Sequence, residues 1–299
     1  MADAPMLRGA MTALITPFKD GHIDEVALRA LVDRQIEGHI DGLVPCGTTG
    51  EASTMSADER VRVIEIVAQQ AAGRVPVIAG TGSNATEASV VFTQRVSEIP
   101  GVSAALVVCP YYNKPNPDMV QRHFESIADE GGLPVVLYNV PGRTVISMTP
   151  EVIGNLSRHP NIIGVKEATG DLGFDAQVFE LTHDVEGFAL LSGDDFTTMP
   201  FVASGGHGCI SVVSNIDPVS MATMCRTASE GDLNTARALH LKIQPLARVL
   251  FERANPVPTK ALAALLGWCE RDVRAPLYPL DDAFVEHLER VARAYGVLP

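Results

Sequence analysis

Short runs of apolar and β-branched residues recur along the chain at roughly thirty-residue spacing, with segments of helical periodicity between them. Within each run the apolar character is continuous and does not alternate with polar positions. Continuous runs are typical of strands covered on both faces, as in a parallel sheet wrapped in helices. The pattern therefore predicts eight strands, at residues 10–15, 42–46, 76–80, 104–109, 134–138, 162–166, 188–192 and 208–213.

The segment at residues 24–37 illustrates the helical periodicity between the runs. Polar side chains such as Asp33 and Glu37 occupy one side of the predicted helix, and apolar side chains occupy the other. The apolar side consists of Val26, Leu28, Leu31, Val32 and Ile36. A second helix is predicted to begin after Ser56, because Ser56 and Glu59 have the spacing of a capping box.

Eight strand-helix units over about 230 residues predict a (β/α)8 TIM barrel, for which about 250 residues is typical. A doubly wound sheet is the alternative, but no G-x-G-x-x-G follows the first run, and polar residues follow nearly every run. Beyond residue 231 the strand pattern stops, and helical patterns occupy residues 262–266 and 284–294. We expect a barrel over residues 1–231 and a C-terminal helical subdomain over residues 232–299, with no linker between them.

Composition and charge narrow the class of protein. Hydrophobic residues make up 46% of the 299 residues, which is enough for a large core. The formal charge of -13, with no Lys/Arg cluster, argues against nucleic acid as a partner. No apolar run approaches the ~18 residues of a membrane span, and residues 1–9 lack the pattern of an export signal. We expect a cytoplasmic protein that does not bind a membrane.

The cysteines and histidines show no metal-binding or redox spacing. The chain has no C-x-x-C pair and no H-x-x-x-H motif, so neither a zinc site nor a disulfide framework is predicted. We expect buried free thiols at Cys46, Cys109, Cys209, Cys225 and Cys269.

Lysine is scarce in this chain, and Lys166 is the lysine that ends an apolar run, at residues 162–166. Alternation with Gly164 would direct its side chain into the barrel, where catalytic groups lie at the C-terminal strand ends. Burial favours the neutral amine, which is the nucleophilic form. We therefore interpret Lys166 as a nucleophile, and a structural ion pair with Glu167 or Asp194 is the alternative.

Other strand ends supply groups that suit a reactive lysine. Tyr138 ends the strand before Lys166, and its hydroxyl can exchange the protons that imine formation requires, although a strand-end tyrosine is often only a packed ring. Thr48 and Thr49 lie in a glycine-bounded turn that suits a small carboxylate. Arg143 follows Tyr138 and can hold a second carboxylate, or remain a solvated surface residue.

Tyr111 and Tyr112 follow another predicted strand and are bracketed by prolines, which restrain the backbone. Aromatic pairs at loop tips commonly bury against a partner chain. A tyrosine supplied by a neighbouring chain would make activity depend on oligomerisation.

Six motifs together resemble the superfamily of pyruvate-dependent lyases and synthases, over the whole chain. Within it, Arg143 and the double threonine resemble the 4-hydroxy-tetrahydrodipicolinate synthase family, whereas N-acetylneuraminate lyases usually read Gly-Ser-Thr-Gly-Glu and lack that arginine. The motifs are GTTGE (47–51), PYYNKP (110–115), YNVPGRT (138–144), GVKEATGD (164–171), SGDD (192–195) and GGHGCISV (205–212).

The resemblance implies the condensation of pyruvate with L-aspartate 4-semialdehyde in lysine and diaminopimelate biosynthesis. It implies that Lys166 carries a pyruvate imine and that no metal or organic cofactor is needed. It further implies that Tyr138 shuttles protons through Thr48 to Tyr112 of an adjacent subunit.

The resemblance also implies the binding roles and the assembly. Thr48 and Thr49 would hold the pyruvate carboxylate, Arg143 would hold the aldehyde's carboxylate, and Gly193 and Ile210 would offer backbone groups. The assembly would be a homotetramer built as a dimer of dimers, with Tyr112 crossing the tight dimer interface.

One departure concerns regulation. Lysine-inhibited relatives place histidines and a glutamate around an effector pocket, and the matching positions here are Ala57, Arg60 and Ala88. Asn84 and Tyr111 do match. We expect weak or absent inhibition by lysine, because the effector's ammonium would lose its carboxylate partner.

Two alternatives remain open from the sequence. Another pyruvate-type Schiff-base aldolase, such as an N-acetylneuraminate lyase or a 2-keto-3-deoxygluconate aldolase, would share Lys166 and Tyr138. A catalytically silent barrel with a binding role would have lost the lysine or the tyrosine, and both are present.

Overall fold

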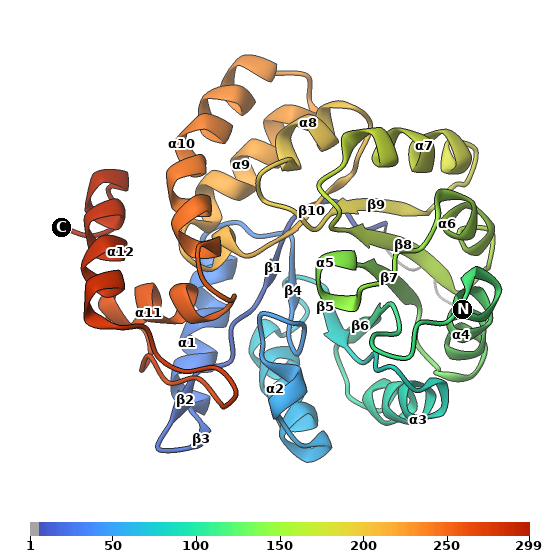
Figure 1. Ribbon diagram of the computed structural model, residues 1–299, viewed down its shortest axis with the longest axis horizontal. Helices are drawn as coiled ribbons and strands as arrows, with labels where there is room; N and C mark the ends of the chain where they lie inside the picture. Colours follow the sequence, from blue (N-terminus) through green and yellow to red (C-terminus); the bar gives the residue numbers. More distant parts are fainter. Residues whose placement is uncertain (1–5) are drawn as a thin grey trace.

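The computed structural model describes residues 6–299 and contains a closed barrel of parallel strands in the order β1-β10-β9-β8-β7-β6-β5-β4 (Figure 1). Each predicted apolar run contains one strand or overlaps it, so the (β/α)8 prediction is confirmed. Residues 1–5, part of the stretch without an expected export signal, lie outside the described residues. The strands are β1 (Gly9–Ala13), β4 (Gly42–Val44), β5 (Val77–Gly80), β6 (Val102–Val108), β7 (Val135–Asn139), β8 (Ile162–Glu167), β9 (Ala189–Ser192) and β10 (Gly208–Ser211).

Helices connect successive strands and form the outer layer of the barrel (Figure 1). Two 3-10 turns, η1 (Ala52–Thr54) and η2 (Val213–Asn215), follow β4 and β10. The connecting helices are α1 (Glu25–Glu37), α2 (Ala57–Ala71), α3 (Thr86–Ser97), α4 (Pro117–Glu130), α5 (Pro141–Thr144), α6 (Pro150–Leu156), α7 (Leu172–Thr182), α8 (Thr198–Ala203) and α9 (Pro218–Ser229).

Local capping explains where the first two helices begin. Asp24 accepts a hydrogen bond from the backbone N–H of Ala27 and ends the extended segment before α1. Ser56 and Glu59 form the predicted capping box at the start of α2. One detail of the α1 prediction is wrong: Val26 is 81% exposed, because the helix turns this position away from the barrel.

A small hairpin before α1 was not predicted. Strands β2 (Phe18–Lys19) and β3 (His22–Ile23) pair antiparallel across Asp20 and Gly21, whose φ angles are 51° and 80°. Two positive φ angles are typical of a type I′ turn, for which Asp-Gly is a favoured sequence. The Asp20-Gly21 dipeptide indicates such a turn, but the two strands are too short to show the alternation of apolar and polar residues that predicts a strand.

The chain beyond the barrel is helical, as predicted, with α10 (Leu233–Phe251), α11 (Val257–Leu265) and α12 (Asp282–Tyr295). These helices lie together on one side of the barrel, at the left of Figure 1, and α10 packs on α9. None of the helices in residues 6–299 combines the length and the apolar character that crossing a membrane requires.

The strands separate two apolar clusters. One fills the barrel interior and includes Met11, Leu106 and Ile210, while the larger one lies between the strands and the helices. Val165 belongs to the outer cluster, and its neighbour Lys166 pairs in register with the interior residue Leu191. Alternation along β8 therefore directs the Lys166 side chain into the barrel.

All five cysteines have free thiols, as predicted. Four of them are buried, whereas Cys269 is only half-buried.

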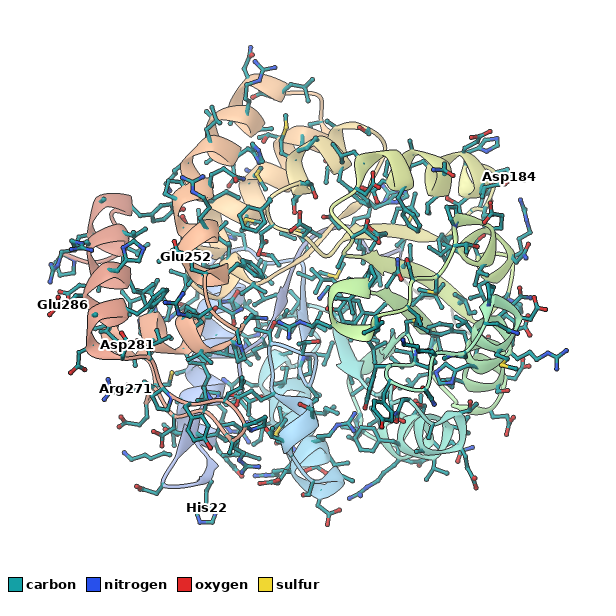
Figure 2. All side chains as sticks on the ribbon, viewed as in Figure 1. His22, Asp184, Glu252, Arg271, Asp281 and Glu286 are labelled. Carbon is teal, nitrogen blue, oxygen red and sulfur yellow. The ribbon has the colours of Figure 1, made fainter. Side chains whose placement is uncertain are left out.

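Ionisable side chains such as those of His22, Asp184 and Glu286 lie at the outer edge of the molecule (Figure 2). By contrast, Lys166, Glu167 and Lys260 are among the buried ionisable residues.

Candidate active site

Lys166 and Tyr138 are direct neighbours at the C-terminal ends of β8 and β7. Their Cα atoms are register partners, and the Lys166 Nζ lies 4.3 Å from the centroid of the Tyr138 ring. Both side chains are 6% exposed. This geometry places the amine over the phenol ring in a nearly dry environment.

Lys166 does not make the ion pair that was the structural alternative. Among residues 6–299 the lysines with ion pairs are Lys242 and Lys260. The carboxylate of Glu167 instead accepts hydrogen bonds from Asn139 Nδ2 at 3.0 Å and from Thr169 Oγ1 at 2.7 Å. Within the described residues, the Lys166 amine is therefore buried without an acidic partner.

Asp194, the other acid considered for that ion pair, is also engaged elsewhere. Its carboxylate accepts hydrogen bonds from Thr197 Oγ1 at 2.8 Å and from the Thr197 N–H at 3.1 Å. Asp194 thus stabilises the loop after β9 and does not neutralise Lys166.

Gly193 packs directly against the lysine side chain. A Cβ atom at this position would lie 3.0 Å from Lys166 Cε and 2.7 Å from Ala168 Cβ, so only glycine fits without displacing these atoms. Its N–H donates to the Glu167 carbonyl at 2.5 Å. Ile210 lies on β10 and is buried in the barrel interior. Both predicted residues thus border the interior that holds Lys166.

The Gly47–Glu51 turn presents unused backbone donors. Gly50 N–H donates to Gly47 O and Glu51 N–H donates to Thr48 O, each at 3.1 Å. The N–H groups of Thr48 and Thr49 have no acceptor within the part of the chain that the structure describes. Adjacent free N–H groups in a tight turn form a concave site for an anion.

The two threonine hydroxyls differ in their surroundings. Thr49 is buried, and its Oγ1 accepts a hydrogen bond from Asn255 Nδ2 at 2.9 Å. Thr48 is half-buried and its side chain faces the cavity described next. The structure therefore leaves Thr48 free to contact a bound molecule, while Thr49 is held by the C-terminal subdomain.

A cavity of about 330 Å³ opens above this end of the barrel. Thr48, Tyr138 and Arg143 all line it, as does Arg60 of α2. Arg143 is exposed, and its Nη2 lies 3.5 Å from the Asn255 carbonyl. A phenol, a hydroxyl and a guanidinium thus converge on one space large enough for a small ligand.

Tyr112 does not join this group within its own chain. Its side chain is 89% exposed and its φ is 76°, a left-handed conformation that is rare for a bulky residue. Tyr111, by contrast, is 39% exposed and lines the cavity. The contribution of Tyr112 to a neighbouring subunit stays a prediction.

A buried carboxyl pair behind Lys166 was not predicted. Glu167 and Asp175 of α7 are 3% and 2% exposed. Burial, and then the negative charge of Glu167, raises the pKa of Asp175 to about 8. Within the described residues, the Glu167 carboxylate accepts several hydrogen bonds, whereas Asp175 Oδ1 has no hydrogen-bond partner. Asp175 therefore carries the proton of the pair. Pairs formed between a strand and the next helix leave no local sequence pattern.

Two further residues near the site were missed for the same reason. Asn255 and Lys260 belong to the C-terminal subdomain and contact the turn from more than 200 positions away, at Thr49 and Glu51 respectively. Lys260 occupies a helical segment and shows no strand-end placement, so nothing in the local pattern distinguishes it.

Comparison with known proteins gives a consistent result. Residues 6–295 match the dihydrodipicolinate synthetase family. A 4-hydroxy-tetrahydrodipicolinate synthase of Maridesulfovibrio salexigens is 50% identical over 97% of this chain and 99% of its own. A dihydrodipicolinate synthase structure from Thermotoga maritima superposes with a TM-score of 0.96, at 37% identity over 98% of this chain and 100% of the other.

A third relative was solved with a substrate-like molecule. The chloride-inhibited dihydrodipicolinate synthase of Acinetobacter baumannii, in complex with pyruvate, has a TM-score of 0.93 at 38% identity and covers 97% of this chain and 99% of its own. Profile, sequence and structure agree over nearly the full length of the chain. The chain therefore belongs to the dihydrodipicolinate synthetase family.

Proposed function

We propose that this chain is a lyase of the 4-hydroxy-tetrahydrodipicolinate synthase type, which condenses pyruvate with L-aspartate 4-semialdehyde in lysine and diaminopimelate biosynthesis. The observation that carries the proposal is the amine of Lys166, which lies 4.3 Å from the centroid of the Tyr138 ring. Lys166 is 6% exposed and pairs with no carboxylate in the part of the chain that the structure describes. An amine in such surroundings is suited to attack a carbonyl group. The names of the relatives supply the substrates.

The first half of the reaction forms an imine between pyruvate and Lys166. The neutral amine attacks the keto carbon, the carbonyl oxygen becomes a hydroxyl group, and loss of water gives the protonated imine. Tyr138, whose ring lies beside the amine, is the proposed donor and acceptor of the proton that this sequence moves. Thr48, which faces the same cavity, links Tyr138 to Tyr112 of an adjacent subunit in the proposed relay.

Pyruvate must be held by its carboxylate while the imine forms. The free N–H groups of Thr48 and Thr49, with the Thr48 hydroxyl, are the proposed site for that carboxylate. Gly193 lies against Lys166 Cε, and Ile210 lies on β10, the strand paired with β9, so their backbone groups are proposed to border the adduct.

In the second half, loss of a methyl proton turns the imine into an enamine, which attacks the aldehyde carbon of L-aspartate 4-semialdehyde. The amino group of this substrate then attacks the imine carbon, which closes the ring and releases Lys166. Arg143, exposed at the cavity, is the proposed partner of the aldehyde's carboxylate. This scheme uses no metal and no organic cofactor.

The proposed assembly is a homotetramer built as a dimer of dimers. Tyr112 projects from the chain with 89% of its side chain exposed, which suits a residue that completes the site of a neighbour. The five free thiols favour a reducing compartment, and the proposed location is the cytoplasm.

Borohydride trapping tests the chemistry. Incubation with pyruvate and borohydride, followed by peptide mapping, is expected to place one reduced adduct on Lys166. An adduct elsewhere, or none, overturns the mechanism. A coupled assay with L-aspartate 4-semialdehyde, run beside N-acetylneuraminate and 2-keto-3-deoxygluconate, then tests the substrate, and preferred turnover of either sugar acid overturns the proposed pathway.

The proposed enzyme is weakly inhibited by lysine, or not at all. Arg60 lines the cavity with a desolvated guanidinium that lies over the Phe92 ring, and Ala57 and Ala88 supply no carboxylate for the effector's ammonium. Half-maximal inhibition at submillimolar lysine would contradict this.

A further inference from the structure

The Glu51 carboxylate is buried at the end of the Gly47–Glu51 turn and is held from outside the barrel. Its Oε1 accepts a hydrogen bond from Lys260 Nζ at 2.7 Å, and its Oε2 accepts one from the Arg274 backbone N–H at 3.0 Å. Glu51 is 3% exposed and Lys260 is 0% exposed. Both partners belong to the C-terminal subdomain, so the subdomain holds this turn through the buried Glu51 carboxylate.

Arg274 extends the same contact to the segment that follows the turn. Its guanidinium donates to the two carboxylate oxygens of Glu59, at 2.6 and 2.9 Å, and to the Thr54 carbonyl at 3.2 Å. The Arg274 guanidinium first, and the Ser56 N–H second, lower the pKa of Glu59 to about 2. The start of α2 is thus fastened to the C-terminal subdomain by a charged pair.

The side chains of Lys260 and Arg274 both stack on the Phe18 ring. Lys260 Nζ lies 4.2 Å and the Arg274 guanidinium carbon lies 4.3 Å from the centroid of the Phe18 ring. Cations over an aromatic ring are attracted by its quadrupole, more strongly where water is excluded. The stack adds a third element, the hairpin before α1, to the contacts around Glu51.

The turn itself has a backbone that needs such support. Cys46 and Glu51 flank it with φ angles of 57° and 55°, in the left-handed region that disfavours residues with a Cβ atom. Conformations of this kind persist only where the surroundings enforce them, and they are common at binding sites. The Glu51 carboxylate, anchored at both oxygens, enforces the second of the two.

We infer that Glu51, Lys260 and Arg274 form a turn anchor that sets the position of the Thr48 and Thr49 donors for the pyruvate carboxylate. The inference rests on the proposed function and assigns these three residues as positioning residues that do not touch substrate. The anchored acid is two residues from Thr49, and a displacement of about 1 Å at a binding group is enough to cost about 10²-fold in rate.

The test compares Lys260→Met with a matched control, Lys242→Met, in the full chain. Lys242 lies in α10 of the same subdomain and pairs with Asp217 at 3.1 Å, but its side chain is 48% exposed. Lys260→Met is expected to raise the KM for pyruvate about tenfold or more while changing the KM for the aldehyde less than about twofold. At saturating pyruvate it still forms the Lys166 adduct, and Lys242→Met leaves both constants unchanged.

A double variant separates positioning from folding. Glu51→Gln with Lys260→Met removes both charges, so the melting temperature is expected to recover relative to Lys260→Met, while the KM for pyruvate stays raised because the anchor is still missing. If Lys260→Met does not fold, the double variant carries the test alone. A pyruvate KM within about twofold of wild type in the folded variants overturns the inference.

Borohydride trapping on the wild type keeps this outcome distinct from a failure of the proposed function. A wild-type adduct on Lys166 together with an unchanged KM in the variants overturns the turn anchor alone. Absence of any wild-type adduct overturns the proposed function, and the turn anchor with it.

Discussion

Two buried lysines in this protein occupy contrasting sites. Lys260 is the more deeply buried, at 0% exposed against 6% for Lys166, and yet it is paired with Glu51 at 2.7 Å. Burial lowers the pKa of Lys260, and the Glu51 carboxylate opposes that change by favouring the charged amine. Lys166 has no such acid among residues 6–299. The comparison teaches that depth of burial does not separate the two lysines, whereas the presence or absence of a paired carboxylate among residues 6–299 does.

The aromatic contacts of the two lysines are alike in geometry and differ in chemistry. Lys166 Nζ lies 4.3 Å from the Tyr138 ring centroid, and Lys260 Nζ lies 4.2 Å from that of Phe18. Only the tyrosine carries a hydroxyl group that can exchange a proton. The proposed reactive site and the structural site therefore differ by one hydroxyl group on the ring and one carboxylate beside the amine.

The largest expected effect comes from Lys166→Met, which removes the proposed nucleophilic amine. Loss of the nucleophile is expected to lower kcat by at least about 10⁴-fold and to abolish borohydride trapping of pyruvate. Thermal melting is expected to be unchanged or raised, because a buried polar amine is replaced by an apolar side chain. Trapping of pyruvate in this variant would show that another group is the nucleophile.

Tyr138→Phe sharpens the difference between the rings by making the Lys166 site resemble the Lys260 site. The ring is retained, so folding is expected to be unaffected, while kcat falls by about 10²–10⁴-fold for want of a proton donor and acceptor. Stopped-flow measurement of imine formation is the readout. Tyr278→Phe, at a position 73% exposed, is the matched control and should match wild type.

Lys166→Met and Tyr138→Phe are expected to act mainly on kcat. Lys260→Met is expected to act mainly on stability. Leaving the Glu51 carboxylate buried without its cation is expected to lower the free energy of unfolding by about 3–5 kcal/mol, as measured by urea denaturation. Lys242→Met, which breaks a half-exposed pair, should cost no more than about 1 kcal/mol. Equal effects of the two substitutions would mean that Glu51 finds another partner.

The carboxyl pair on the far side of β8 from Lys166 is expected to make the stability depend on pH. Folded Asp175 keeps its proton up to about pH 8, whereas an unfolded aspartate loses it near pH 3.9. The folded state therefore binds more protons between these values, and the free energy of unfolding falls as pH rises from about 4 to 8, by at most about 1.4 kcal/mol per pH unit.

Asp175→Asn removes this titration while keeping a neutral hydrogen-bond donor beside Glu167. The slope of the unfolding free energy against pH is expected to flatten between pH 5 and pH 8, roughly by the contribution of one proton. Urea denaturation at several pH values measures it. An unchanged slope would place the proton on another group.

The barrel was predictable because its determinants are local. Continuous apolar runs require two covered faces, and each run marked a strand within a few residues. The capping box at Ser56 and Glu59 was equally legible, since both partners lie within one helical turn. The wrong placement of Val26 shows the limit, because periodicity describes one helix and does not say how that helix is rotated on the barrel.

The sequence by itself determined the strand that carries Lys166, the strand that carries Tyr138, and their order, so it placed an amine beside a phenol. Only the tertiary structure decided that, among residues 6–299, Lys260 pairs with a carboxylate and Lys166 does not, because Glu51 and Lys260 are 209 positions apart. Strand periodicity acts over a few residues, whereas the contact between a buried charge and its partner depends on how distant segments pack. For that reason the candidate nucleophile could be predicted from the sequence, while the contacts that hold its surroundings could not.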